Sequence, residues 1–442
     1  MSGDTTVPRG ATTELGKVEG NLVVHDARIR PETPGEVIQV TGVTECRDDC
    51  SFEASLVTSE LTGRGGDITV EGDLTVERNI KIRRGELIVH GNLNSKKVEV
   101  DRRMDVRGDM DVDSANVGGS LRVKGTSKAS RVDVGGSLKA ESDFEVEEID
   151  VGGTVRIEGS TKSDMIDVGG TFEGNGPVEA GVMDVGGSVK IYSEASVDEI
   201  DVGGSVTLTG GEVKERVRVG GSLKSSKPLD FNLIRVGGSV TISGGNGNNI
   251  RVGGTLRSEG DLTFENIDVG GTVSIDGNAA GQKIDVGGTV RVHGDLELSD
   301  VLNVGGTADV EGELRAKDVK VGGKVIAEKV EAIDEIQTNT LRTRFGVKAR
   351  RIEIGRRGEV EGPLIAQTIV IRDRGRAEDI YAEKVTLRKR SRAKNVYASV
   401  IDIESDCRIT GEVKYTESIY TERNVNFANS PEKVEKLPPP PF

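Results

Sequence analysis

Three histidines and a pair of cysteines are the side chains of this sequence that most readily carry out chemistry. His25, His90 and His293 stand far apart in the chain, whereas a nucleophile and its base must lie within hydrogen-bond reach of each other. Cys46 and Cys50, in the stretch CRDDC, offer two thiolates, but a closed zinc site takes four ligands. The sequence therefore predicts neither a catalytic site nor a metal site at these residues, and it favours an ordinary loop for CRDDC.

Two recurring patterns could attract ions. The letters VGG, followed in nearly every case by Ser or Thr, suggest a phosphate cradle, but such a cradle needs a helix N-terminus behind it. An aspartate column precedes VGG, at Asp133, Asp150, Asp167, Asp184 and Asp201, and neighbours about 4.8 Å apart would repel by roughly 0.9 kcal/mol in water. The known calcium-binding repeat is a nine-residue Gly/Asp-rich unit that is absent here. We expect structural corners and solvated carboxylates, with no metal and no cofactor.

The elements that must carry these residues follow from a repeat. VGG recurs thirteen times between Val117 and Val321, at steps of about 17 residues that vary by no more than one. The residues two places before the valine and four places after it are apolar throughout, as Ile149 and Val155 are around Val151. Alternation of this kind indicates strands with one buried face, and a unit of this length is too short for a strand–helix–strand crossover. Each unit therefore contains three short strands separated by turns.

A fixed period with three strands per unit describes one coil of a β-helix. We predict an all-β, elongated, single-stranded parallel β-helix, a triangular β-solenoid of about 21 coils of 16 to 18 residues. VGG is expected to be a corner at which the backbone reaches φ > 0, which glycine adopts without penalty. The first glycines of these corners are Gly118, Gly135, Gly152, Gly169, Gly186, Gly203, Gly220, Gly237, Gly253, Gly270, Gly287, Gly305 and Gly322.

The repeat weakens toward both ends, which divides the chain into parts. Residues 1–14 are expected to be disordered, and residues 15–67 to form an irregular N-terminal cap with one or more coils. The VGG-repeat solenoid is expected over residues 68–331 and a continuation of it over residues 332–422. Residues 423–442 are expected to be a proline-rich disordered tail, because proline has no backbone donor for a sheet.

Charge and composition narrow the class of protein. The net charge of −15 opposes nucleic-acid binding, since an acidic surface repels phosphates. Neither a leader segment nor an apolar run of membrane-spanning length is apparent, and an odd number of cysteines argues against a disulfide framework. We therefore expect a cytoplasmic protein.

Basic residues concentrate between positions 341 and 400, a stretch that contains 16 Lys or Arg but only 7 Asp or Glu. The densest run contains Arg388, Lys389, Arg390, Arg392 and Lys394. Two interpretations stay open. The run is either a set of solvated, outward strand residues, or a contact band for an anionic membrane surface or an acidic neighbour.

Residues 351–413 carry a recurring I-x-I, then a turn, then V-x-G-x-L-x-A, at nearly the same spacing as VGG. In this pattern the segment resembles a bactofilin domain. Bactofilins are polymer-forming cytoskeletal proteins whose right-handed triangular β-helices join end to end, without nucleotide, into non-polar filaments. The resemblance implies a right-handed coil, a filament or scaffold subunit at the cell envelope, and end-to-end contact through a terminal aromatic residue, for which Phe427 is the nearest match. Bactofilin cores are much shorter than this chain, and the apolar N-terminal stretch of some members has no counterpart in MSGDTTVPRG.

The open ends of a solenoid have unpaired strand edges, which favours self-association. We expect a structural, self-assembling cytoskeletal or scaffold protein, not an enzyme, that polymerises by end-to-end stacking without nucleotide. Its expected partner is itself, with envelope proteins or a membrane surface as further partners, and neither nucleic acid nor a small-molecule substrate. The alternative is a surface-exposed β-solenoid adhesin or carbohydrate-binding protein, which requires export. A hexapeptide-repeat acyltransferase fits poorly, because it needs a six-residue strand repeat.

Overall fold

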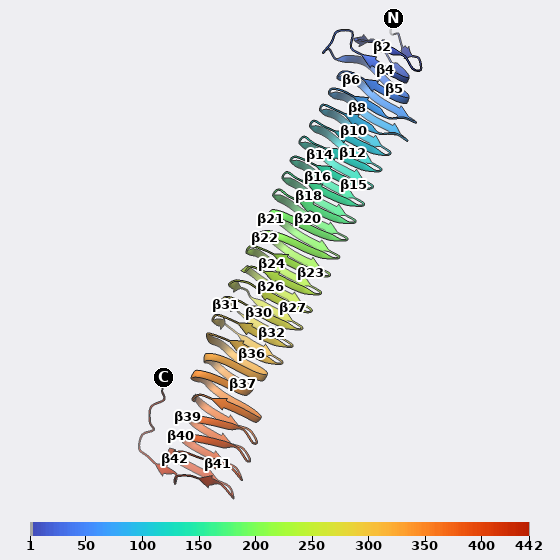
Figure 1. Ribbon diagram of the computed structural model, residues 1–442. Helices are drawn as coiled ribbons and strands as arrows, with labels where there is room; N and C mark the ends of the chain where they lie inside the picture. Colours follow the sequence, from blue (N-terminus) through green and yellow to red (C-terminus); the bar gives the residue numbers. More distant parts are fainter. Residues whose placement is uncertain (1–2, 442) are drawn as a thin grey trace. The chain divides into compact units, whose positions relative to one another are not determined.

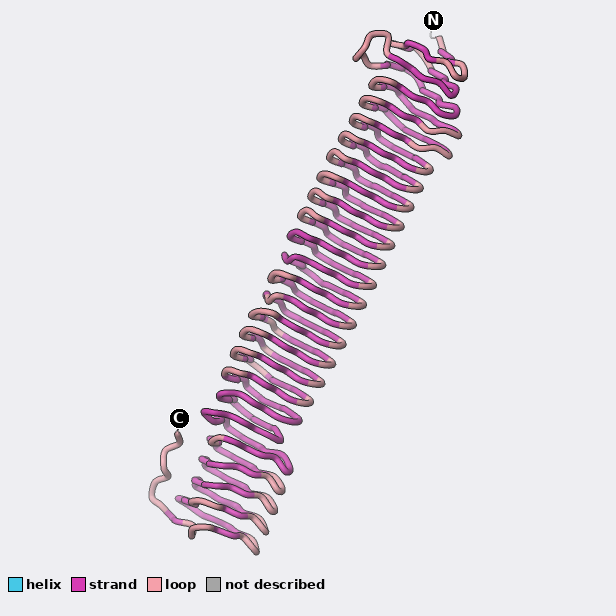
Figure 2. Tube along the Cα trace, in the orientation of Figure 1, coloured by secondary structure: helices cyan, strands magenta, loops and turns pink. Residues whose placement is uncertain are grey.

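The computed structural model describes residues 3–441, which are organised in parallel strands without any helix. The chain divides into two compact units, Met1–Gly221 (unit 1) and Ser222–Phe442 (unit 2). Within each unit, neighbouring coils stack in sequence order and pair through their strands (Figures 1 and 2). The expected all-β parallel solenoid is thus confirmed. There are about 25 coils rather than 21, because coils also form before residue 68 and after residue 422.

The strands of unit 1 are β1 (Thr5–Val7), β2 (Thr12–Glu14), β3 (Lys17–Val18), β4 (Leu22–Arg30), β5 (Ile38–Phe52), β6 (Leu56–Arg64), β7 (Ile68–Val70), β8 (Leu74–Arg83), β9 (Leu87–Val89), β10 (Leu93–Val100), β11 (Arg103–Val106), β12 (Met110–Val117), β13 (Ser120–Val123), β14 (Ser127–Val134), β15 (Ser137–Ala140), β16 (Phe144–Val151), β17 (Thr154–Ile157), β18 (Thr161–Val168), β19 (Thr171–Gly174), β20 (Val178–Val185), β21 (Ser188–Val202) and β22 (Ser205–Val219).

The strands of unit 2 are β23 (Ser222–Ser225), β24 (Leu229–Val236), β25 (Ser239–Ile242), β26 (Gly245–Val252), β27 (Thr255–Ser258), β28 (Leu262–Thr263), β29 (Asn266–Val269), β30 (Thr272–Ile275), β31 (Ala279–Gly281), β32 (Lys283–Val286), β33 (Thr289–Val292), β34 (Leu296–Leu298), β35 (Val301–Val304), β36 (Thr307–Val310), β37 (Glu313–Glu361), β38 (Leu364–Ile371), β39 (Arg376–Leu387), β40 (Arg392–Ile403), β41 (Arg408–Ile409), β42 (Val413–Thr421), β43 (Asn426–Phe427) and β44 (Glu432–Lys433).

One coil of unit 1 shows how the repeat makes these elements. Strand β16 covers two faces of the coil and β17 covers the third. Alternation buries Phe144 and Val146, and the next buried residue, Ile149, follows after three positions instead of two. That extra residue bends the strand, so that Ile149 and Val151 face the core from the second face. The three-stranded coil expected from the sequence is therefore present, with one of its corners inside a continuous strand.

Stacking in register turns the repeat into columns of like residues. Ile149 lies opposite Val132 on the preceding coil and Ile166 on the following coil, and all three are fully buried. A buried aliphatic side chain contributes roughly 1.5–3 kcal/mol relative to an exposed one. Each coil therefore depends on its neighbours to keep its inward side chains dry.

The VGG corners differ from the expectation in their backbone. None of their glycines is among the residues of the described chain with a left-handed φ, so the prediction of φ > 0 at these corners was wrong. A Cβ on Gly152 would instead lie 2.6 Å from the carbonyl oxygen of Gly135 on the preceding coil. The Gly152 amide also donates a hydrogen bond of 3.0 Å to Val134 O. Glycine is required because stacked corner backbones leave no room for a side chain.

Left-handed residues form the corner where the VGG motif ends. In the last coils of unit 2, one non-glycine residue per coil has φ between 59° and 62°: Arg357, Arg374, Arg390, Asp406 and Asn424. A left-handed φ carries a conformational cost for a residue with a side chain, a cost that VGG avoids. The solenoid thus has two kinds of corner, one made by VGG and one made by a left-handed residue, while the coil length stays nearly constant.

Aspartate and asparagine side chains hold another corner, which was not predicted from the sequence. Asp73 Oδ1 accepts a hydrogen bond of 2.7 Å from the Asn92 amide, and Asn92 Oδ1 accepts one of 2.8 Å from the Asp109 amide. Asp109 Oδ1 then accepts one of 2.7 Å from the Thr126 amide. The recurring letters Gly-Asp or Gly-Asn before an apolar residue are the signal that could have revealed this ladder.

Both terminal segments contain more structure than expected. Strands β1 and β2, within the segment predicted to be disordered, pair with β4, while residues 1–2 lie outside the described residues. In the segment predicted to be a disordered tail, β43 pairs with β41 and β44 with β42. This additional coil forms because the apolar columns continue as far as Phe427, and Phe427 covers the coil before it.

Candidate functional site

Two of the three histidines, His90 and His293, lie beside acidic residues of adjacent coils, and no ion pair is found for His25 within the described residues. His90 Nδ1 lies 2.5 Å from Glu71 Oε2, and His293 Nδ1 lies 3.1 Å from Asp276 Oδ1. Within the described residues, no group of three or more His, Cys, Asp and Glu side chains could hold a metal ion. The same residues include no helix of the length and apolarity needed to cross a membrane.

Cys46 and Cys50 belong to the core of unit 1 rather than to a loop. Both lie in β5, are buried and form no disulfide. The corner between them turns at Asp48, whose φ is 61°. Burial, followed by the adjacent Cys50 thiol, raises the pKa of Cys46 well above its usual range. CRDDC is therefore a coil corner with two inward thiols, a placement that spacing alone did not indicate.

The aspartate column is real and carries mutual repulsion. Asp150, Asp167 and Asp184 stand in register on consecutive coils. Burial, and then the charges of these two neighbours, raise the pKa of Asp167. At the end of the column, Arg218 Nη1 lies 3.0 Å from Asp201 Oδ2. The column of residues before VGG continues with Arg218 after Asp201, and this switch from aspartate to arginine places opposite charges side by side.

The basic run lies on the surface of unit 2 and is partly neutralised. Its five residues are all exposed: Arg388, Lys389, Arg390, Arg392 and Lys394. Arg388 pairs with Glu404, and Arg390 Nε lies 3.8 Å from Asp406 Oδ2. Among the described residues, the three others make no ion pair. The positive surface is therefore smaller than the sequence run, because acidic residues of the next coil lie beside it.

The C-terminal end of unit 2 leaves strand edge and core exposed. Strand β42 pairs with β40 on one side, but on the other side it meets β44 only at Lys414 and Tyr415. Ile419, in the remaining part of β42, is half-buried, although the residue it stacks on, Ile401, is 1% exposed. Phe427 stacks on the buried Ile409 and is itself half-buried. The proposed contact residue Phe427 therefore lies in the last coil, at the open end.

The N-terminal end of unit 1 is better covered. Val7 and Val18, in the first coil, are 1% and 4% exposed. Residues 31–37 form the only long insertion of this described region, and Glu32 from it approaches Gly16 of the first coil. The two ends thus differ in their inward columns, since Val7 and Val18 are buried whereas Ile419 and Phe427 are only half-buried, although Val37 of the insertion is 40% exposed.

A groove runs along unit 2 at the bend between two faces of the coils, with a volume of about 1430 Å³. Its floor is a column of residues three positions before an inward aliphatic residue, the place that Val146 holds before Ile149 in unit 1, and in unit 2 this column is mostly alanine. The floor residues are Gly281, Leu298, Ala316, Ala332, Ala349, Ala366 and Ala382. The equivalent column in unit 1 floors a groove of only about 350 Å³.

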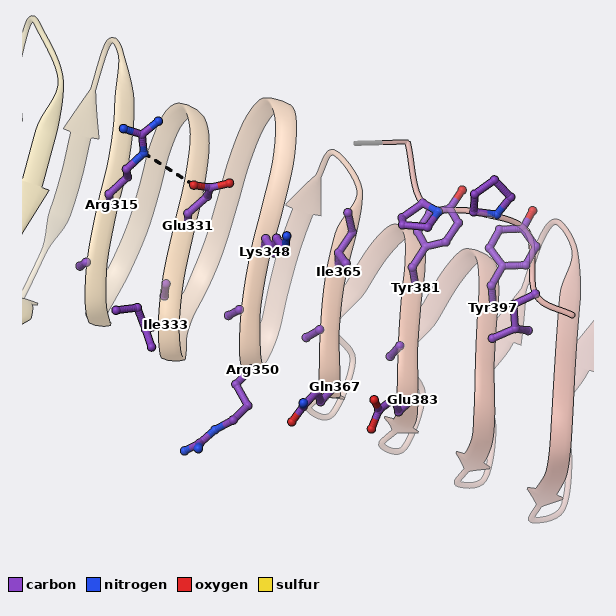
Figure 3. Close-up of a pocket in the computed structure, with 18 of the residues that line it drawn as sticks. Arg315, Glu331, Ile333, Lys348, Arg350, Ile365, Gln367, Tyr381, Glu383 and Tyr397 are labelled. Atoms are coloured by element: carbon purple, nitrogen blue, oxygen red, sulfur yellow. Dashed lines mark ion pairs between the residues drawn. The ribbon is translucent and has the colours of Figure 1, made fainter.

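Aromatic side chains line one end of this groove (Figure 3). The rings of Tyr381 and Tyr397 have their centroids 5.0 Å apart at an interplanar angle of 35°. Tyr397 donates its hydroxyl hydrogen to Glu412 Oε2 at 3.1 Å. Burial, with this carboxylate next in effect, raises the pKa of Tyr397 to about 12, so the phenol stays protonated and held in place.

The C-terminal tail, residues 435–441, passes over the same tyrosines (Figure 3). Leu437 and Pro438 are half-buried there, and Pro439 and Pro440 also line the groove. Neither the groove nor this contact was predicted from the sequence. The alanines that recur once per coil from Ala316 were the available signal.

Comparison with known proteins adds no assignment. No protein family, no curated protein and no solved structure was found to match this chain. The bactofilin-like pattern of residues 351–413 therefore stays a prediction from the sequence.

Proposed function

We propose that this protein is a self-assembling cytoskeletal or scaffold subunit, whose solenoids stack end to end without nucleotide. The observation that carries the proposal is the open last coil of unit 2. Its strand edge beyond Tyr415 has no partner in the described chain, and it leaves Ile419 and Phe427 half-exposed. Strand edges of this kind pair readily with another chain.

End-to-end assembly requires two kinds of contact, namely burial of apolar side chains and backbone hydrogen bonds along the free strand edge. Completing the burial of a half-exposed aliphatic side chain contributes roughly 1 kcal/mol, whereas association costs about 4 to 15 kcal/mol in lost freedom of motion. A few apolar side chains are therefore insufficient. Backbone hydrogen bonds along the free edge of β42 must supply a large part of the remainder, which makes assembly steeply dependent on correct strand alignment.

The difference between the ends gives an order of assembly. Val7 and Val18 are already buried at the N-terminal end, so an N-terminal contact gains little apolar burial from the inward columns. We expect pairs of chains joined at their C-terminal ends at low concentration, and longer polymers only at higher concentration. The sequence pattern of residues 351–413 supports this proposal, because the bactofilin proteins that it resembles form non-polar filaments.

The proposal includes a cytoplasmic location, with envelope proteins or an anionic membrane surface as partners. Lys389, Arg392 and Lys394 are exposed, and their charged side chains make no ion pair within the described chain. They are available to lipid headgroups, at about 1 kcal/mol per basic residue near an anionic surface. Sedimentation with vesicles that contain phosphatidylserine, at low and high salt, tests this part separately.

Analytical ultracentrifugation and negative-stain microscopy of the full chain, over a wide range of concentration and without nucleotide, test the assembly. We expect pairs and then filaments. The variants Ile419→Lys and Phe427→Asp should shift assembly to at least about tenfold higher concentration, which corresponds to 1.4 kcal/mol. Tyr192→Lys is the matched control, because Tyr192 is a 53% exposed residue of unit 1 and does not belong to the open coil. Monomers at every concentration, or end variants that assemble like the control, would refute the proposal.

A further inference from the structure

The groove of unit 2 has a feature that end-to-end stacking does not explain, namely a proline-rich segment lying in it. We propose that this groove is a binding site for extended proline-rich segments, and that its occupant is the tail of the same chain, residues 435–441, bound reversibly. The proposal is independent of the proposed function, because the groove lies on the side of the coils and not at their end.

The floor of the groove suits an extended polypeptide. Ala349, Ala366 and Ala382 stand opposite one another on consecutive coils and form a straight apolar track. Coils repeat about every 4.8 Å, and a polyproline II segment advances about 3.1 Å per residue. The six residues Glu435–Pro440 thus span roughly four coils, which matches a segment that runs along the coil stack.

The tyrosine pair supplies the recognition of proline. Aromatic-lined grooves bind proline-rich segments because pyrrolidine rings pack flat on aromatic rings and the polyproline helix is already ordered. Tyr381 and Tyr397 lie next to each other under the tail (Figure 3). The hydrogen bond from Tyr397 to Glu412 holds one ring in position without the tail. The site is therefore preorganised.

The tail fits this site by side-chain contact alone. The last backbone hydrogen bond that holds this region of the described chain runs from the Val434 amide to Tyr415 O, at 2.9 Å. Beyond it, proline has no amide to extend the sheet, and Leu437 and Pro438 provide the buried contacts. A contact without backbone pairing is weak, and it persists because attachment to the last coil keeps the tail at a high effective concentration.

The groove is longer than the tail that occupies it. It continues past the tyrosines to Leu298 and Ala316, and Ile333 on its wall is 72% exposed. A longer proline-rich segment could therefore displace the tail and gain apolar contacts that the tail does not make.

The test uses the full chain, a chain that ends at Val434, and the fluorescent peptide EKLPPPPF as the probe. Fluorescence anisotropy should show saturable binding to the shortened chain, and at least about tenfold weaker binding to the full chain, because the tail competes at millimolar effective concentration. The peptide EKLAAAAF should bind weakly to both. Equal binding of EKLPPPPF to both chains, or no binding to the shortened chain, would overturn the proposal.

Single substitutions test whether the peptide binds at the tyrosine pair. In the shortened chain, Tyr381→Ala should weaken peptide binding by about tenfold, the equivalent of one aromatic contact, whereas Tyr381→Phe should retain it. Tyr192→Ala, at an exposed tyrosine of unit 1, is the matched control. Thermal melting followed by circular dichroism checks that each variant is folded, and loss of binding in Tyr192→Ala as well would refute the assignment.

The source of the occupant is tested by energy transfer between dyes on Ile333→Cys and Pro441→Cys, since the native thiols are buried. Transfer that is unchanged by an excess of unlabelled protein indicates a tail bound to its own chain. Transfer lost on such dilution would place the tail on a second copy and contradict the proposed occupant. Filaments that form equally well from the shortened chain would show that the groove and the open end act separately.

Discussion

Substitution of a corner glycine tests why VGG recurs. In Gly153→Ala, the new Cβ would lie 2.4 Å from the carbonyl oxygen of Gly136 on the preceding coil. Carbon and oxygen atoms make favourable contacts at about 3.3 Å or more, so the two coils must separate locally or shift. Gly136 O also accepts a hydrogen bond of 3.3 Å from the Thr154 amide, which opposes such a shift. We expect a loss of about 1 to 3 kcal/mol, the usual cost of overpacking.

A second substitution separates close approach from backbone conformation. If glycine were needed for φ > 0, Gly153→Asn would be milder than Gly153→Ala, because asparagine tolerates the left-handed region. With close approach as the cause, Gly153→Asn should be at least as damaging. Gly65 is the matched control, since its φ is +87° and a Cβ there would lie 3.5 Å from its nearest neighbour, Asp48 Oδ1. Gly65→Asn should therefore be tolerated better than Gly65→Ala.

Urea unfolding followed by circular dichroism measures these differences. Hydrogen exchange of the amides near residue 153 complements it, because repeat proteins can unfold in parts. We expect faster exchange in the coils next to the substitution and unchanged exchange in distant coils of unit 1. Wild-type stability in Gly153→Ala, or a rescue by asparagine at this position, would refute the reasoning from close approach.

Three further predictions concern the columns and the core. Asp109→Ala should lower the free energy of unfolding by about 1 to 2 kcal/mol, because the Thr126 amide loses its acceptor, and Asp109→Asn, which keeps the acceptor, should lie near wild type in urea unfolding. Asp167→Asn should stabilise the protein by less than about 1 kcal/mol at neutral pH, since it removes the cost of partly burying a charged carboxylate and, next in effect, the solvent-screened repulsion from Asp150 and Asp184. The pKa of Asp167 is raised in the folded state, so this gain should vanish as the pH falls below the pKa of the unfolded carboxyl, and a gain that persists in acid would contradict the assigned cause. The three buried thiols should react with Ellman's reagent only after unfolding, and rapid reaction of the folded protein would show that the core opens.

The repeat was sufficient to predict the coil, because period and alternation are properties of the backbone pairing itself. Ile149 and its equivalents recur once in every unit of the repeat, and parallel pairing in register places them in one column. The reason for the glycines was not accessible in the same way. A turn with φ > 0 and a close approach between coils both call for glycine, and only the position of Gly135 O relative to Gly152 distinguishes them.

The candidate surfaces were predicted less completely. The exposure of the basic run follows from its charge. Its partial neutralisation depends on Glu404, which is one coil further along the chain and reaches Arg388 only because the coils stack. Prediction of the open end would have required knowing how far the final segment continues the sheet. Strands β43 and β44 cover part of this end.

The amino-acid sequence by itself determined the fold class, the coil length and the identity of the buried columns, because each rests on a one-dimensional period that the backbone converts into stacking. Only the tertiary structure decided where the surface is hollow and where the core is left uncovered. The groove is lined by residues of successive coils, Ala366 among them, and by residues 435–440 of the returning tail. Such features arise from residues that meet across coils and at chain ends, where the period no longer specifies which partner is near.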